Sequence, residues 1–207
     1  MPGELGSLRE CVIAEREVQG LRLLELDLAG GALACVGGIG KVNAARAATL
    51  LIAEARPRRL LIAGVCGGLK RHLVPGTLVH CERAIQTDLA VREGREVTPD
   101  PELRAAWERE SPGTTGSFLT ADRPVLSRWR RLRLARAFAG DCVADMETAA
   151  AAAVCRAAGV HWAALRAVTD GAGAAALLSF RKHYPSQGGR AADSVPGLLD
   201  RLEGPRA

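Results

Sequence analysis

The sequence predicts a fold of the α/β class, in which helices are layered against a sheet, and three observations support this. Short apolar runs alternate along the chain with longer stretches rich in Ala, Leu and Arg, the succession expected of strands and helices in layered folds. Glycine clusters interrupt several of these stretches, where they permit tight turns. The length of 207 residues fits one domain, and no stretch has the composition of a linker. We therefore expect residues 1–207 to form a single domain.

Six apolar runs are predicted to be strands of the sheet. They are Ala32–Val36, Arg59–Ala63, Thr77–Cys81, Gly116–Thr120, Cys142–Met146 and His161–Val168. Among them, Arg59–Ala63 is expected to be a buried central strand, because its continuous apolar character is typical of strands that are covered on both faces. The glycines in the sequence GVCGGL, residues 64–69, are predicted to break the second of these strands.

Three stretches are predicted to be helices. Val42–Ala55 and Thr148–Ala158 consist almost wholly of residues with high helix propensity. A third helix is expected near the C-terminus, with Ser194 as its N-cap and Pro196 near its first turn. The stretch Glu93–Thr115 is polar and contains Pro and Gly, and we expect it to be an extended excursion over the surface.

The cysteines indicate a reducing compartment. An even number in a small secreted protein would suggest a disulfide framework, but no C-x-x-C pair occurs, and each cysteine lies in an apolar run where a free thiol behaves as a small hydrophobe. They are Cys11, Cys35, Cys66, Cys81, Cys142 and Cys155. The N-terminus lacks a basic region followed by an apolar stretch, and no segment approaches the roughly 20 apolar residues that span a bilayer. We expect a soluble cytoplasmic protein without a membrane partner.

The net charge of +5 and the pI near 9.1 raise nucleic acid as a partner. Basic residues cluster at Arg56–Arg59 and at Arg128–Arg136. The second cluster is expected to be an amphipathic surface helix, with an apolar stripe made of Val125, Trp129, Leu132 and Leu134. Because no stacking aromatics are interleaved with the arginines, the surface helix is preferred to a nucleic-acid site.

Residues suited to catalysis follow several of the predicted strands. Ligands of open α/β sheets collect at the carboxyl ends of strands, and those positions here are Gly64–Gly68, Asp145–Glu147 and Thr169–Asp170. Acidic residues at neighbouring strand ends suit acid catalysis and the binding of sugar hydroxyls. The GGIGK sequence of residues 37–41 does not fit the phosphate-loop or dinucleotide template, so a tight strand-to-helix turn is the better interpretation.

Five segments, in their order and spacing, make the chain resemble the nucleoside phosphorylase superfamily. They are GGIGKVNAARAATLL, IAGVCGGLKRHLVPGTLVH, GSFLTADRPV, VADMETAAAAAVC and LRAVTDGAG. The resemblance is greatest to the 5′-methylthioadenosine/S-adenosylhomocysteine nucleosidase branch, and it covers most of the chain from Ala32 to Phe180. It implies a three-layer fold with a mixed central sheet flanked by helices. It also implies cleavage of the N-glycosidic bond of a purine nucleoside, without a metal or cofactor.

The resemblance implies a role for each of two acids. Asp170 would protonate, or donate a hydrogen bond to, N7 of the purine as its bond to ribose breaks, and it would thereby make the base a neutral leaving group. Glu147 would accept hydrogen bonds from the ribose 2′ and 3′ hydroxyls, and its charge would favour an oxocarbenium-like transition state. The alternative is that either carboxylate is an N-cap.

The resemblance also implies residues that line the substrate site. Met146 would pack beneath the sugar, Val125 and Ala172 would line the base pocket, and Phe180 would cover the 5′ substituent unless it is only a core contact. Val65 and Gly67 belong to the same implied site.

The carboxylate that activates the attacking water in the family is implied to be Glu4, because it lies in a pattern like G-x-M-x-x-E-hydrophobic with Leu5 and Leu8 at helical spacing. Glu10 is the alternative base. Relatives have a complete strand before this position, whereas here Met1–Gly3 precede Glu4. We therefore expect either that the chain begins late or that the sheet lacks its first inner strand.

Water is the expected nucleophile rather than phosphate. Phosphorylases of the superfamily hold phosphate with an Arg and a Ser, and Ile62 and Val65 stand at those positions here. An Arg from elsewhere could still serve. The remaining alternatives are a futalosine hydrolase, which shares the GIGKVNAA sequence of Gly38–Ala45 but typically has Asn at position 170, another hydrolase or phosphorylase of a 5′-modified nucleoside, and a non-catalytic nucleoside-binding relative. Relatives complete their pockets across a subunit interface, which implies a homodimer.

Overall fold

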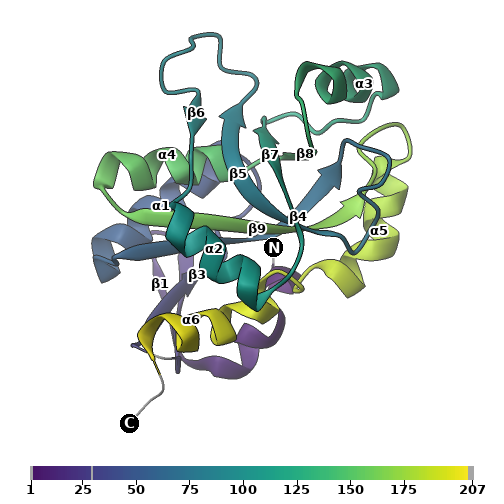
Figure 1. The fold of residues 1–207 in the computed structure, drawn as a ribbon. Helices are drawn as coiled ribbons and strands as arrows, with labels where there is room; N and C mark the ends of the chain where they lie inside the picture. The colour runs from purple at the N-terminus through teal and green to yellow at the C-terminus, as the bar shows by residue number, and fades with distance from the viewer. Residues whose placement is uncertain (1, 29, 205–207) are drawn as a thin grey trace.

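The computed structural model describes residues 2–28 and 30–204. Its strands are β1 Val12–Val18, β2 Leu21–Leu26, β3 Ala32–Cys35, β4 Arg59–Gly68, β5 Leu78–Gln86, β6 Glu96–Val97, β7 Thr114–Thr120, β8 Cys142–Asp145 and β9 His161–Asp170. Its helices are α1 Lys41–Ala55, α2 Pro101–Glu110, α3 Arg128–Ala137, α4 Thr148–Ala158, α5 Ala176–Gln187 and α6 Val195–Glu203, with the 3-10 segments η1 Pro2–Cys11 and η2 Ala192–Ser194. Figure 1 labels most of them along the chain.

The main sheet is mixed and curls around on itself. Its strand order is β6-β5-β7-β8-β4-β9, and β5 also pairs with β9. The β4–β9 pair is parallel from Arg59↔His161 to Gly67↔Asp170, so both strands deliver their carboxyl ends to the same edge. The β1, β2 and β3 strands form a second, antiparallel sheet.

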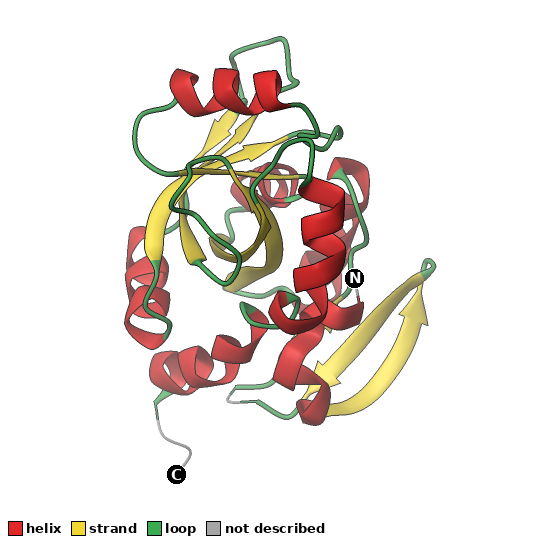
Figure 2. Cartoon of the chain, turned by 90° about the vertical axis from the view of Figure 1, so that its right-hand side faces the viewer, coloured by secondary structure: helices red, strands yellow, loops and turns green. Residues whose placement is uncertain are grey.

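Helices cover both faces of the main sheet, as the alternation of side chains along β9 shows. Trp162, Ala164 and Val168 belong to a core shared with the alanines of α1 and α4. Ala163 and Leu165 point to the other face, into a core built with α2 and α6. Figure 2 shows the curved sheet enclosed by helices. The expected three-layer architecture with a mixed central sheet is therefore confirmed.

Two predicted element boundaries are wrong. Glycines do not break β4, which runs on to Gly68 because Gly64–Gly67 keep their pairing with β9. The stretch Glu93–Thr115 is not an extended excursion, because it holds β6, α2 and the start of β7. Asp100 caps α2 by accepting a hydrogen bond from the Leu103 N–H, and Trp107 of that helix is fully buried.

Two further predictions are only partly correct. The basic cluster forms the surface helix α3, but Trp129 is 81% exposed and so does not belong to an apolar stripe. Leu134, by contrast, packs against the buried cluster that contains Val125. Ser194 does occupy the N-cap position of α6, but it makes no capping hydrogen bond. Its hydroxyl instead donates to the Ala191 carbonyl and accepts from the Trp107 indole.

Strands β3 and β4 face each other across a cavity, without pairing between them among the described residues. Residues Leu61, Ile62 and Ala63 of β4 are only half-buried, although their partners on β9 are at most 1% exposed. One side of β4 therefore lacks the cover that a central strand normally has. This is the geometry expected of a sheet without its first inner strand.

The predicted reduced cysteines are confirmed, since all six are free thiols in the structure. Cys66, Cys81, Cys142 and Cys155 are buried, and Cys11 and Cys35 are half-buried. Within residues 2–28 and 30–204, no helix combines the length and apolarity that crossing a bilayer requires.

Candidate active site

A cavity of about 850 Å³ runs along β4 between this strand and β3, and it includes the carboxyl ends of β4, β8 and β9. Its volume is in the range of small-molecule sites. The structure brings every predicted site residue to its lining: Glu4, Val65, Gly67, Val125, Met146, Glu147, Asp170, Ala172 and Phe180. The alternative base Glu10 is exposed and does not line this cavity.

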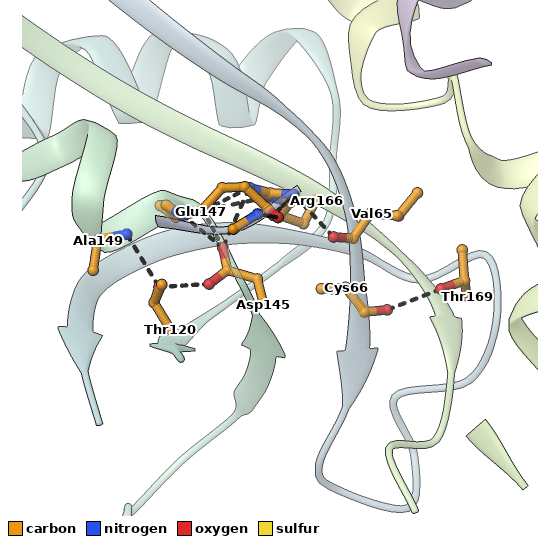
Figure 3. A network of polar contacts seen from close by, with 10 residues as sticks. Val65, Cys66, Thr120, Asp145, Glu147, Ala149, Arg166 and Thr169 are labelled. Carbon is orange, nitrogen blue, oxygen red and sulfur yellow. Dashed lines mark hydrogen bonds and ion pairs between the residues drawn. The ribbon is translucent and has the colours of Figure 1, made fainter. Parts of the chain in front are cut away.

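The centre of the site is a buried arginine that the sequence analysis did not single out. Arg166 lies on β9 with its side chain 4% exposed, and it forms ion pairs with Asp145 at 3.3 Å and with Glu147 at 3.2 Å. Its Nη1 also donates to the Val65 carbonyl at 3.0 Å. Figure 3 shows the guanidinium between these groups. Burial alone would lower the pKa of Arg166, but the neighbouring carboxylates together raise it, so the arginine carries its charge throughout the working pH range.

Asp145 is held by hydrogen bonds from two threonines and by the ion pair with Arg166. It ends β8, its side chain is fully buried, and it accepts hydrogen bonds from the Thr120 hydroxyl at 2.5 Å and the Thr148 N–H at 3.1 Å. The Thr148 hydroxyl donates to Asp145 and accepts from Nη2 of Arg166 at 3.0 Å. Asp145 thus supplies the cap of α4 that Glu147, at the N-cap position, does not supply.

Glu147 presents a partly exposed carboxylate to the cavity. Its Oε1 accepts from the Gly40 N–H at 3.0 Å and its Oε2 faces Arg166. The two contacts leave lone pairs for further donors such as sugar hydroxyls. Burial raises the pKa of Glu147, opposed by Arg166 and assisted by Asp145. The alternative of a simple N-cap does not hold for this residue, because its side chain makes no capping bond.

Asp170 is a second carboxyl group in the cavity, at the end of β9. Its Oδ1 accepts from the Ala172 N–H at 2.8 Å, and its Oδ2 accepts from the Thr169 hydroxyl at 3.1 Å. The first contact closes a turn rather than capping a helix. Burial raises the pKa of Asp170, although these two hydrogen bonds oppose the shift. A carboxyl group that holds its proton at higher pH is suited to general-acid catalysis.

The predicted apolar residues surround these acids. Val125 and Ala172 are buried in one cluster, while Phe180 of α5 stacks on Tyr184 with ring centroids 5.0 Å apart. Phe180 is only half-buried and borders the cavity, so it is more than a core contact. Exposed Leu126 and Leu177 lie at the same cavity.

Gly64 explains how β4 brings Glu4 close to Arg166. A Cβ atom at Gly64 would lie 2.7 Å from Nη1 of Arg166 and 3.0 Å from Oε1 of Glu4. Both charged groups therefore rest against the bare backbone of this residue. At Gly67 an added Cβ would lie 3.0 Å from Oδ1 of Asp170. The glycines that seemed to be strand breakers are the places where β4 makes room for the site.

The substitution Gly64→Ala tests this close approach. Since four partners hold the Arg166 guanidinium, we expect the new methyl group to displace it together with Glu4. Misplacement of catalytic groups by about 1 Å can cost on the order of 100-fold in rate, whereas overpacking costs about 1–3 kcal/mol of stability. Steady-state turnover and chemical denaturation of the same preparation separate the two effects. Wild-type turnover in the variant would show that the charged pair tolerates displacement.

Sequence signals for Arg166 and Asp145 existed. Arg166 is the one charged residue in the apolar strand sequence WAALRAV, and a buried charge requires a partner. Asp145 was noted only as a strand-end acid. Within the described part of the chain, no group of three or more His, Cys, Asp or Glu side chains is arranged to hold a metal ion.

Fold and site together define an α/β protein with carboxylates at its strand ends that line a mostly apolar cavity. The chain belongs to the phosphorylase superfamily, whose family model matches residues 1–200. The predicted family membership is therefore confirmed.

Curated relatives and solved structures agree with this membership. The chain is 28% identical over 212 residues to a 5′-methylthioadenosine/S-adenosylhomocysteine nucleosidase of Geobacillus sp., covering 94% of this chain and 89% of that protein. It is 27% identical to the nucleosidase of Mycobacterium tuberculosis, with coverages of 98% and 93%. The structure of the Neisseria meningitidis nucleosidase with methylthio-immucillin-A matches at a TM-score of 0.90 and 25% identity, covering 98% and 96% of the two chains. A futalosine hydrolase of Helicobacter pylori shares the fold at a TM-score of 0.91 and 22% identity, with coverages of 98% and 95%.

Proposed function

We propose that this protein hydrolyses the N-glycosidic bond of a purine nucleoside of the 5′-methylthioadenosine or S-adenosylhomocysteine kind. The observation that carries the proposal is the placement of Asp170, Glu147 and Glu4 on one cavity. Relatives of similar length bear the name of this activity, and so does the Neisseria protein whose structure was solved in complex with methylthio-immucillin-A.

In the proposed reaction, Asp170 donates a proton to the departing base, and burial favours the protonated form by raising the pKa of this carboxyl. Glu147 accepts hydrogen bonds from the ribose hydroxyls through the lone pairs left free by Gly40 and Arg166. Positive charge then develops on the sugar, and the surplus of carboxylates over the single Arg166 stabilises it. Glu4 takes a proton from the water that attacks the sugar. Met146, Val125 and Phe180 enclose the substrate.

Water is the proposed nucleophile because Arg166 is not free to bind phosphate. Its guanidinium already contacts two carboxylates, the Val65 carbonyl and the Thr148 hydroxyl. A phosphate near Gly64 would also face the carboxylates of Glu4 and Glu147. The arrangement therefore favours hydrolysis over phosphorolysis.

The test is a release assay with purified protein. We expect free adenine from methylthioadenosine or S-adenosylhomocysteine at a rate independent of added phosphate. A second candidate, suggested by the shared fold of the futalosine hydrolase, is hydrolysis of futalosine, so futalosine, inosine and adenosine belong in the same panel. Binding without release would identify a non-catalytic relative, and a requirement for phosphate would identify a phosphorylase.

The biological unit is proposed to be a cytoplasmic homodimer in which each chain is one domain. Exposed apolar side chains suit burial against a second copy; Leu126 and Leu177 border the cavity, and Trp129 and Leu178 lie on α3 and α5. Gel filtration at micromolar concentration tests the dimer, and a single cooperative unfolding transition tests the single domain. The arginines of α3 are proposed to remain solvated, so salt-dependent binding to DNA or RNA would argue against that assignment.

A further inference from the structure

We propose that Asp145 is a positioning residue for the reaction: as a second counter-ion of Arg166, it leaves the carboxylate of Glu147 available to the sugar. This inference rests on the proposed function, because it concerns how the same site holds a ribose. Asp145 itself does not touch the substrate in this assignment.

Arg166 is shared between two acids. One terminal nitrogen, Nη2, faces Asp145 at 3.3 Å, and the other, Nη1, faces Glu147 at 3.2 Å. A buried guanidinium needs full compensation of its charge. Because Asp145 supplies one counter-charge from a fully buried position, Arg166 does not have to draw both oxygens of Glu147 into a bidentate pair.

Asp145 is held rigidly. The Thr120 hydroxyl, the Thr148 N–H and the Thr148 hydroxyl all donate to it. The same Thr148 hydroxyl accepts from Nε and Nη2 of Arg166, at 3.3 and 3.0 Å. Figure 3 shows that Asp145 approaches Arg166 from the β8 side, away from Val65. The arginine is therefore tethered at its Asp145 side and extends only one nitrogen toward Glu147.

The position of Arg166 affects Glu147. Charged groups face it from β9 (Arg166), from β8 (Asp145) and from η1 (Glu4), and the N–H of Gly40 meets it ahead of α1. If Asp145 loses its charge, Arg166 remains uncompensated on one side and moves toward Glu147. The oxygen that would bind a ribose hydroxyl then becomes occupied by the guanidinium.

The experiment compares two substrates in each variant: methylthioadenosine and its 2′-deoxy counterpart. The ratio of their kcat/KM values reports how strongly the site interacts with the 2′ hydroxyl. Comparison with the wild-type ratio cancels the intrinsic difference in reactivity between the two substrates. We expect Asp145→Asn to reduce the preference for the ribose substrate by about tenfold, the order of one hydrogen bond to a charged group. Glu147→Gln is the positive control and should reduce the same ratio.

Thr120→Val is the matched control, because it removes a hydrogen bond to Asp145 and leaves the charge. Because the N–H and hydroxyl of Thr148 still hold Asp145 in this variant, we expect a lower melting temperature and an unchanged ratio. The acid limb of the plot of kcat/KM against pH is a second readout. Since the Asp145 charge raises the pKa of Glu147, Asp145→Asn should move this limb to lower pH, and Thr120→Val should not move it.

Each outcome bears on the proposal. If Asp145→Asn lowers kcat/KM equally for both substrates and does not move the acid limb of the pH profile, the positioning role is overturned and a structural role remains. If Asp145→Asn does not fold, Asp145→Ser removes the same charge with a smaller polar side chain, and an unchanged ratio in that variant overturns the inference. A wild-type chain that neither binds nor cleaves these nucleosides overturns the proposed function and this inference with it. If the wild type cleaves these nucleosides but the ratio is unchanged in Asp145→Asn, only the inference is overturned.

Discussion

Asp170→Asn is expected to reduce kcat by about 10²- to 10⁴-fold, the usual contribution of a general acid, while the fold is preserved. The amide can still accept the Ala172 N–H through its oxygen, and the Thr169 hydroxyl retains the Cys66 carbonyl as an acceptor at 3.3 Å. Turnover of methylthioadenosine and the melting temperature are the measurements. The exposed Asp200→Asn substitution on α6 is the isosteric control and should keep full activity.

The pH dependence of Asp170 has a defined sign. Because burial raises its pKa in the folded protein, the folded state favours the protonated carboxyl. The stability associated with this proton is present below the pKa of an unfolded Asp and is lost as pH rises through the folded pKa. Wild-type activity should fall over that upper range, and the residual activity of Asp170→Asn should lack this alkaline limb. At neutral pH the neutral variant should be no less stable than the wild type. An alkaline limb that persists in the variant would remove Asp170 as the acid.

Arg166→Met is expected to destabilise the protein by about 3–5 kcal/mol, because it leaves buried carboxylates without their cation. Turnover should be lost as well, since Asp145, Glu147 and Glu4 would then repel one another around the sugar site. Urea denaturation provides the free energy of unfolding, and the release assay provides turnover under conditions where the variant is folded.

The matched control is Arg201→Met. Arg201 pairs with Glu110 at 3.0 Å, but its side chain is 47% exposed. We therefore expect the free energy of unfolding to fall by about 1 kcal/mol or less. A similar decrease in the free energy of unfolding in both variants would show that the buried ion pairs of Arg166 stabilise the protein no more than the exposed pair of Arg201 does. Full activity of a folded Arg166→Met variant would contradict the central place of this arginine.

Local sequence patterns predicted much of the fold and the reactive acids. The helix Thr148–Ala158 begins and ends as predicted, because its composition and the glycine after it leave few alternatives. Asp170 and Glu147 were predicted as site residues because ligands collect at the carboxyl ends of strands in this class of fold. Figure 1 shows β4 and β9 running side by side, and because they are parallel their carboxyl ends lie at the same edge of the sheet. Conversely, the prediction of an extended surface excursion for Glu93–Thr115 was wrong. The polar composition of this stretch concealed the helix cap at Asp100 and the one buried helix face that contains Trp107.

The sequence by itself determined the α/β class, the family and the acids at the strand ends, since these depend on patterns of neighbouring residues. Only the tertiary structure decided that Gly64 and Gly67 stay within a strand and make room for charged side chains. It also decided that Arg166 is shared between Asp145 and Glu147, and that one edge of β4 faces a cavity. The physical reason is that the energy of a buried charge depends on which groups surround it in space, and spacing along the chain does not contain that information.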